Sequence, residues 1–246
     1  MKTEILYGIH PVFEALKAGK RNFYKIYLSQ DKTSKRFKKI LEAAASLKIP
    51  LERINASKLE SIAGTGLHQG IGASVSPYPL AGLSNIIDKQ RPPGAGHFLL
   101  LLDNVVDPHN LGALIRTALC VGVDGVIITK DRSAMPTPAV SRSSAGALEH
   151  VAMAVATNMV STMSLLKKKG IWIVGMDKAA QSSIFSFDFS GSIAVIIGGE
   201  EKGIRSLVKK HCDFITSIPQ EGPVTSLNAS VAGAVVMYEA FRQRSV

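Results

Sequence analysis

The chain has little cysteine and no long apolar run. Its two cysteines, Cys120 and Cys212, lie far apart and have no neighbouring clusters of metal-ligating residues. This argues against a disulfide framework or a zinc site and is typical of a protein kept in a reducing cytoplasm. No apolar stretch reaches the roughly 20 residues of a membrane-spanning helix, and the start, MKTEILYGIH, lacks the apolar stretch of a signal peptide. We therefore expect a cytoplasmic protein with no membrane partner.

Acidic residues are scarce relative to basic ones. The chain holds 29 Lys and Arg against 19 Asp and Glu, which gives a net charge of +10, and its pI is about 9.6. Residues 1–95 carry 15 basic against 7 acidic side chains (+8), whereas residues 96–246 carry 14 against 12 (+2). This charge favours a polyanionic partner. Residues 1–95, which carry most of the excess positive charge, are the predicted nucleic-acid-binding region. The alternative is a basic surface that only keeps the protein soluble.

The pattern of apolar residues predicts two α/β domains. Residues 1–76 predict strands at 5–7, 24–29, 50–54 and 70–76 and helices at 10–18, 32–47 and 57–62. Residues 77–96 hold seven prolines and glycines and predict a linker with at most one helical turn at 84–88. Residues 97–246 predict strands at 98–102, 125–129, 171–175, 193–198 and 214–218, separated by helices at 111–120, 141–149, 157–169 and 204–210 and followed by one at 226–241.

Such an alternation is typical of an open, mostly parallel sheet with helices on both faces, whose ligands bind beyond the carboxyl ends of the strands. Three loops lie at such ends: DNVVDPHNLG (103–112), GGEEKG (198–203) and IPQEGPVTSLN (218–228). If their strands are neighbours, the loops converge on one site. In the third loop Ser226 is expected to cap the following helix, with Asn228 on its first turn facing a ligand. An ordinary core helix is the alternative reading.

The second loop has the wrong spacing for a nucleotide-binding G-x-G-x-x-G turn, and its two glutamates would repel a pyrophosphate. A ligand without phosphate and with a positive charge, such as S-adenosyl-L-methionine, suits it better. Gly198 and Gly199 would let the backbone approach that ligand closely, or they serve only the geometry of the turn. Arg116 lies in an apolar stretch, LGALIRTALCVG, and needs an anionic partner. Glu200, an RNA phosphate and a structural ion pair are the candidates.

Two classes of site are excluded by spacing. Asp103, Asp107, His109 and Glu200 match no known metal-binding pattern, so no metal is expected. There is no G-x-S-x-G elbow and no histidine placed to serve Ser226, which argues against a serine hydrolase.

Three stretches resemble, in order, the three motifs of the SpoU/TrmH family of RNA ribose 2′-O-methyltransferases: LDNVVDPHNLGALIRTA (ending at Ala118), IIGGEEKGI (196–204) and IPQEGPVTSLNASVA (218–232). YGIHPVFEAL (7–16) and HQGI (68–71) are similar to the small N-terminal domain of the long members. The resemblance implies an α/β fold. Its C-terminal SPOUT domain would contain a mostly parallel sheet and a deep trefoil knot, and its N-terminal α/β RNA-binding domain would be similar to a ribosomal protein.

The resemblance also implies a site and its partners. Asn110, Arg116, Glu200, Ser226 and Asn228 fall on the motif positions of the catalytic site, and Gly198, Gly199, Ile218, Pro219 and Leu227 fall where the family holds its cofactor. The implied cofactor is S-adenosyl-L-methionine, the implied substrate is a guanosine of large-subunit rRNA, and the implied assembly is a homodimer. Glu201 and Lys202 occupy positions that vary within the family.

Three other functions stay open at this point. The same reaction could act on a tRNA or on another rRNA site. The chain could be a non-catalytic RNA-binding factor of ribosome assembly, although the motif residues are intact. A nicotinamide-dependent oxidoreductase is the third, which the spacing of GGEEKG argues against.

Overall fold

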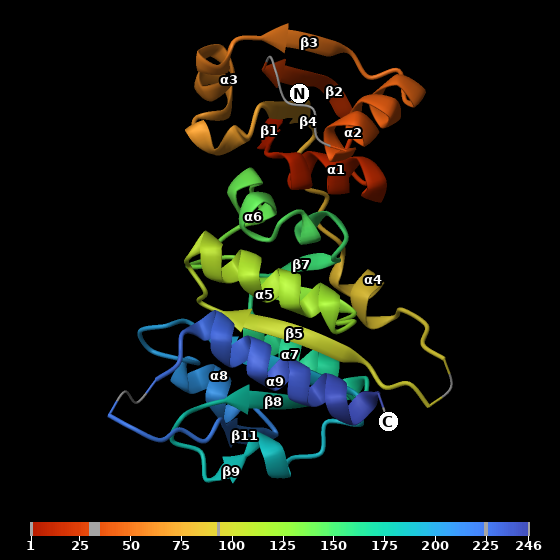
Figure 1. Cartoon of the computed structure of the whole chain (residues 1–246). Helices are drawn as coiled ribbons and strands as arrows, with labels where there is room; N and C mark the ends of the chain where they lie inside the picture. The colour runs from red at the N-terminus through yellow and green to blue at the C-terminus, as the bar shows by residue number, and fades with distance from the viewer. Residues whose placement is uncertain (1, 30–34, 93, 224–225, 246) are drawn as a thin grey trace. The chain divides into compact units, whose positions relative to one another are not determined.

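The computed structural model describes residues 2–29, 35–92, 94–223 and 226–245 (Figure 1). The chain forms two compact units. The first comprises Met1–Pro79 with Met135–His150, and the second comprises Leu80–Ala134 with Val151–Val246. The predicted domains of 1–76 and 97–246 with a linker between them stay a prediction.

The first unit is built on a four-stranded mixed sheet with the order β1-β4-β2-β3. Its elements are β1 (Glu4–Tyr7), α1 (Ile9–Ala18), β2 (Phe23–Ser29), α2 (Lys35–Ser46), β3 (Leu51–Ile54), α3 (Ala56–Ala63), η1 (Gly66–His68) and β4 (Ile71–Val75). Ile71 and Ala73 of β4 belong to the core that α1 and α2 cover. Because side chains alternate along a strand, Gly72 faces the other way, where Leu59 of α3 lies 3.0 Å from the position of a Cβ. The predicted start of α2 at Lys32 lies outside the described residues.

A buried ion pair binds residues 135–150 into this unit. The Arg21 side chain is fully buried, and its Nε donates to Glu149 Oε2 at 2.7 Å while its Nη1 donates to Glu4 Oε2 at 2.7 Å. Ser141 Oγ donates to Glu149 Oε1 at 2.7 Å. Removing one member of such a group would leave a charge uncompensated, which is costly in a buried position. The helices α6 (Pro138–Ser143) and η2 (Ala147–Glu149) are therefore structural parts of the first unit.

The second unit is a seven-stranded sheet with the order β7-β6-β5-β10-β8-β11-β9. Its strands are β5 (Phe98–Asp103), β6 (Gly125–Thr129), β7 (Met153–Ala156), β8 (Trp172–Met176), β9 (Ser182–Ser183), β10 (Ile193–Gly198) and β11 (Phe214–Ser217). Every adjacent pair of strands is parallel. The strands β5, β6 and β10 are buried along their whole length, as continuous apolar runs predict for a parallel sheet covered on both faces.

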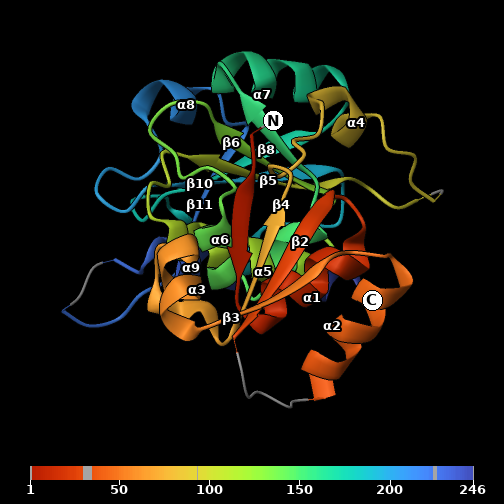
Figure 2. The same cartoon turned by 90° about the horizontal axis from the view of Figure 1, so that it is seen from above.

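Helices cover both faces of this sheet. The elements are α4 (Leu83–Ile87), α5 (Pro108–Cys120), α7 (Met159–Lys168), η3 (Ile184–Ser186), α8 (Ser206–Lys210) and α9 (Ala229–Arg244). Figure 2 shows α7 and α8 on one side of the sheet and α5 and α9 on the other. A Cβ at Gly233 of α9 would lie 2.2 Å from Leu114 Cδ2 of α5, so this glycine permits the close contact between the two helices. The knot that the resemblance implies stays a prediction.

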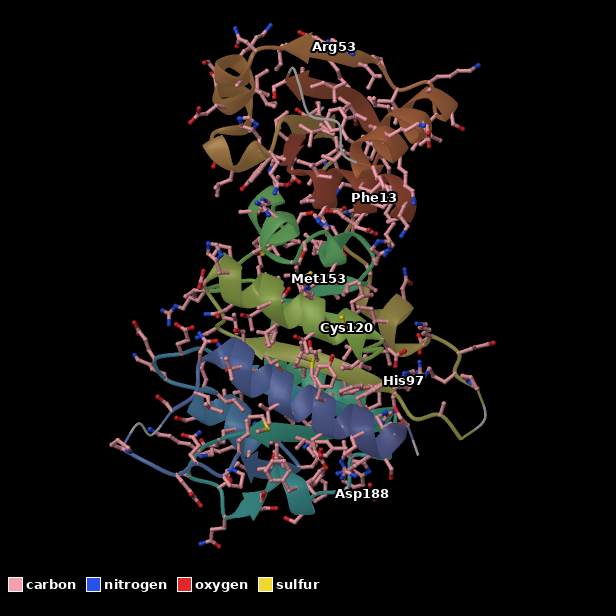
Figure 3. The ribbon with its side chains drawn as sticks, viewed as in Figure 1. Phe13, Arg53, His97, Cys120, Met153 and Asp188 are labelled. Carbon is pink, nitrogen blue, oxygen red and sulfur yellow. The ribbon has the colours of Figure 1, made fainter. Side chains whose placement is uncertain are left out.

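The predicted element order is confirmed in outline, with four differences. Two strands were not predicted: β7, which begins at the fully buried Met153 (Figure 3), and the two-residue strand β9. The helix predicted at 141–149 is divided into α6 and η2. The helix α5 begins at Pro108 because the Asp107 side chain caps it by accepting from the backbone N–H of His109. Residues within the predicted linker pack into the core of the second unit, where Ile86 and Ile87 are 1% and 3% exposed.

A candidate active site at the carboxyl ends of the strands

The loop after β10 is fixed to the end of β5. Asp103, the last residue of β5, is fully buried, and its carboxylate accepts from the Arg205 backbone N–H at 2.9 Å and from Arg205 Nε at 2.8 Å. The Asp103 carbonyl oxygen accepts from the Gly199 N–H at 2.9 Å. Asp103 therefore serves as the anchor of the GGEEKG loop.

Glycine is required in this loop because the chain packs on itself. A Cβ at Gly198 would lie 2.0 Å from the carbonyl carbon of Gly203, and one at Gly199 would lie 2.3 Å from the carbonyl oxygen of Asn104. Neither position can hold a side chain without moving the backbone. The close approach that the sequence analysis linked to a ligand is made by protein atoms at these points.

Three side chains, one from each predicted loop, form a hydrogen-bonded group that we call the Asn–Glu junction: Asn110, Glu200 and Asn228. Glu200 Oε1 accepts from Asn228 Nδ2 at 2.8 Å and from Asn110 Nδ2. Asn228 Nδ2 also donates to Asn110 Oδ1 at 3.1 Å. The convergence of the three loops is confirmed, although β8 lies between β10 and β11 in the sheet.

The cap of α9 corrects the sequence analysis. The N-cap is Asn228, not Ser226, and the helix begins at Ala229. Asn228 Oδ1 accepts from the backbone N–H of Ser230 at 2.8 Å and of Val231 at 3.3 Å. Asparagine and serine are about equally good caps, so the sequence did not decide between them. Asn228 thus uses its oxygen for the helix and its nitrogen for the junction.

Arg116 does not pair with Glu200. Glu200 Oε1 is taken by the two asparagines, and Arg116 lies six residues after Asn110, about 9 Å further along α5. The Arg116 side chain is exposed and makes no ion pair or hydrogen bond within the part of the chain that the structure describes. Of the partners considered from sequence, an RNA phosphate is compatible with this exposed position.

A cavity of about 350 Å³ opens beside the junction. Its lining includes Gly198, Gly199, Glu200, Ile218, Ser226 and Leu227, together with a segment that the sequence analysis missed, Met176–Lys178. That segment begins at the last residue of β8, so the rule that ligands bind at the carboxyl ends of strands could have found it. Pro219 lines a neighbouring cavity of about 430 Å³ instead, with Lys178 and Ser217 among its other residues.

Carboxylates outnumber ammonium groups around the first cavity. Asp177, Glu200 and Glu201 contribute to its lining, against Lys178 and Lys202. Burial opposes the ionisation of Asp177, but hydrogen bonds from Lys209 Nζ and the Ala179 N–H outweigh it and hold its pKa below the usual range. Apolar side chains complete the wall: Met176, Ile197, Ile218, Leu227, Ala229 and Ala232. Such a cavity favours a ligand with apolar surface and positive charge over a phosphate-bearing one.

Among the residues that the structure describes, no three His, Cys, Asp or Glu side chains are grouped to hold a metal ion. No helix within the described ranges combines the length and apolar character needed to cross a bilayer.

Comparison with protein families matches nearly the whole chain. Residues 97–238 match the SpoU rRNA Methylase family, and residues 5–81 match the family described as RNA 2′-O ribose methyltransferase substrate binding. The 23S rRNA (guanosine-2′-O-)-methyltransferase RlmB of Pseudomonas putida is 37% identical over 248 aligned residues, which cover 100% of this chain and 98% of that protein. YacO of Bacillus subtilis, whose name places it in the TrmH family of tRNA/rRNA methyltransferases, is 38% identical over 97% of this chain and 95% of its own length.

A solved structure shares the fold over almost the full length. The SpoU methyltransferase AviRb of Streptomyces viridochromogenes, in complex with the cofactor AdoMet, is 25% identical and has a TM-score of 0.82. The match covers 99% of this chain and 91% of that one.

Proposed function

This chain belongs to the SpoU family of RNA 2′-O-ribose methyltransferases, and we propose that it methylates the ribose 2′-hydroxyl of a guanosine in large-subunit (23S) rRNA with S-adenosyl-L-methionine as methyl donor. The observation that carries the proposal is the Asn–Glu junction, which brings residues of all three motifs together beside a cavity. The full-length similarity to RlmB supports the guanosine of 23S rRNA as the substrate. Such a substrate implies that the protein works in the cytoplasm.

The cavity fits the cofactor. S-adenosyl-L-methionine supplies a methyl group activated by a sulfonium charge and carries an adenosine but no phosphate. The lining combines an excess of carboxylates with apolar side chains, and its volume of about 350 Å³ lies in the range of small-molecule sites. Gly198, Gly199, Ile218 and Leu227 would hold the cofactor, and the AviRb structure with AdoMet shows that a related fold does bind it. Pro219 would contribute only from the adjoining cavity.

The side chains of the junction would orient the ribose. Its 2′-hydroxyl is a weak acid, so the oxygen needs a positive neighbour as its proton leaves. Arginine stays protonated, so Arg116 would clamp an RNA phosphate and stabilise the developing negative charge rather than act as a base. Asn110, Asn228 and Ser226 would position the sugar and the methionine end of the cofactor. Glu200 holds both asparagines in place.

The proposed assembly is a homodimer formed through α9. Val231, Tyr238 and Phe241 are 47%, 52% and 40% exposed, and their spacing places them along one side of the helix. A stripe of exposed apolar side chains is typical of a protein interface. Sedimentation equilibrium of the wild-type protein and of Tyr238→Glu tests this, and a monomeric wild type would exclude the dimer.

The decisive measurement is transfer of a labelled methyl group from S-adenosyl-L-methionine to unmodified 23S rRNA and, in parallel, to bulk tRNA. We expect label on rRNA, at the ribose of a guanosine after nuclease digestion. Label on tRNA alone would show that the substrate is a tRNA and not 23S rRNA; the name of YacO includes both kinds of RNA. No label on either RNA would favour a non-catalytic RNA-binding protein.

A further inference from the structure

Seven Lys and Arg side chains in the second unit are paired with carboxylates, whereas eight have no such pair within the described residues, and Lys130 and Arg132, beside the candidate active site, are among these eight. Lys130 and Arg132 are exposed, and no ion pair is found for either within the described ranges. The pairs elsewhere in the unit are Lys89 and Arg91 with Asp124, Lys167 with Asp213, Lys169 with Asp88, Lys209 with Asp177, Arg205 with Asp103 and Arg242 with Glu239. The charges of Lys130 and Arg132 are thus available to a partner.

The loop that carries these two residues lies at the same edge of the sheet as the junction. It follows β6, which pairs in parallel with β5 so that Ile128 lies beside Leu102. The Ala134 N–H donates to the Val105 carbonyl oxygen at 2.8 Å, which joins this loop to the one that leads to Asn110. The carboxyl ends of β5 and β6 therefore place Lys130 and Arg132 next to the first motif loop.

Arg132 has a backbone conformation that arginine rarely adopts. Its φ is 54°, in the left-handed region where glycine and asparagine are common and long side chains are not. Thr129 holds the turn, since its Oγ1 donates to the Asp131 carbonyl oxygen at 3.0 Å and lies 2.5 Å from Ser133 Oγ. Strain of this kind costs about 1–3 kcal/mol and is concentrated at ligand clamps and active sites. A glycine here would avoid the strain but would lose the guanidinium group.

We propose that Lys130 and Arg132 bind backbone phosphates of the RNA strand next to the target nucleotide. The inference rests on the proposed function, because it takes the partner to be the RNA that is methylated. A guanidinium donates two parallel hydrogen bonds to a phosphate, and a lysine adds a point charge. Asp131 is the one carboxylate in the stretch 130–134, so the loop keeps a net charge of +1. The partner is therefore a phosphodiester strand lying across the carboxyl edge of the sheet.

The test measures RNA binding by the full-length protein as a function of salt. Arg132→Gly removes the guanidinium and suits the positive φ, so the variant should fold at least as stably as wild type. Lys130→Ala has a matched control in Lys168→Ala, because Lys168 is also exposed and unpaired among the described residues but lies on α7, whose end precedes β8 at the opposite edge. The probe is a fluorescently labelled 23S rRNA transcript, and methyl transfer to the same transcript is measured alongside.

We expect Arg132→Gly to weaken binding about tenfold and to lower the slope of log K against log salt by about one. Lys130→Ala should lower the slope similarly, and Lys168→Ala should match wild type. Unchanged affinity and slope for Arg132→Gly and Lys130→Ala, or an equal loss for Lys168→Ala, would overturn the inference. A wild type that transfers no methyl group while the two variants still lose RNA affinity would refute the proposed function and leave this binding site standing.

Discussion

Glu200 shows, at the scale of single residues, what the sequence could and could not predict. The motif resemblance selected Asn110, Glu200 and Asn228 as one site, and their side chains are in contact. The sequence also offered Glu200 as the residue that holds either Arg116 or Asn110, and in the structure it accepts a hydrogen bond from Asn110. Hydrogen-bond partners depend on the reach of side chains from three separate loops, which no local pattern encodes. Asn110 is 7% exposed, so its amide needs a partner more than the exposed Arg116 does.

Arg116→Ala should separate chemistry from cofactor binding. Arg116 is not among the residues that line the cavity, so the affinity for S-adenosyl-L-methionine should stay within a few-fold of wild type. Methyl transfer should fall by roughly a hundredfold or more, as expected when a group that stabilises developing charge is removed. Single-turnover transfer and calorimetric titration of the cofactor measure the two effects.

Arg116→Lys is the matched control, because it keeps the positive charge and loses the planar fork. Its activity should lie between those of wild type and Arg116→Ala. A large loss of cofactor affinity in either variant would contradict the assigned role.

At the scale of elements, the N-terminus of α9 has both a structural and a functional role. The sequence predicted a helix here and placed its cap two residues too early. Apolar spacing defines the body of a helix well, but its first residue depends on which of several good capping residues adopts the required geometry. Asn228 is that residue because its oxygen reaches two backbone N–H groups while its nitrogen reaches Glu200.

Two substitutions of Asn228 should divide these roles. Serine is a good cap but is too short to replace the amide that donates to Glu200, so Asn228→Ser should keep the free energy of unfolding within about 0.5 kcal/mol and lose methyl transfer. Asn228→Ala should lose both the helix cap and methyl transfer, with a decrease in the free energy of unfolding of about 1 kcal/mol. Chemical denaturation and methyl transfer are measured on both variants. Equal stability of the two would show that the cap contributes little.

The last turns of α9 carry a pH-dependent contact. Hydrogen bonds from Arg242 and Gln243 lower the pKa of Glu239 from 4.5 to about 2. The carboxylate of Glu239 therefore stabilises the folded state above the unfolded pKa of about 4.5, and this contribution is lost as the pH falls towards 2. Denaturation of wild type and Glu239→Gln between pH 6 and pH 2 tests this, over roughly the range in which carboxylates titrate. The stability difference should shrink with falling pH, and a constant difference would refute the contact.

At the scale of the whole molecule, the large parallel sheet is the part that the sequence predicted best. Continuous apolar runs such as FLLLL identify strands that are covered on both faces, and these strands were found. β7 was missed because its four residues, MAVA, are too short to stand out. The inclusion of residues 135–150 in the first unit was not predictable, because it depends on an ion pair between residues 128 positions apart, Arg21 and Glu149. Composition alone likewise marked residues 77–96 as a spacer, whereas Ile86 and Ile87 are buried.

Two truncated proteins, residues 80–246 and residues 96–246, should reveal whether the predicted linker of residues 77–96 is only a spacer. Both keep every residue that lines the cofactor cavity, and both lose the basic N-terminal residues, so RNA affinity should fall in each. The shorter fragment also loses Ile86 and Ile87 from the core and removes Arg91 from the buried Asp124, which it contacts at 2.6 Å. Loss of large core side chains costs about 2–5 kcal/mol each. The Tm of fragment 96–246 should therefore be lower than that of 80–246 by about 10 °C or more, measured by calorimetry with and without S-adenosyl-L-methionine. Equal Tm values would mean that residues 80–95 contribute no packing energy and that the spacer predicted from composition was the better description.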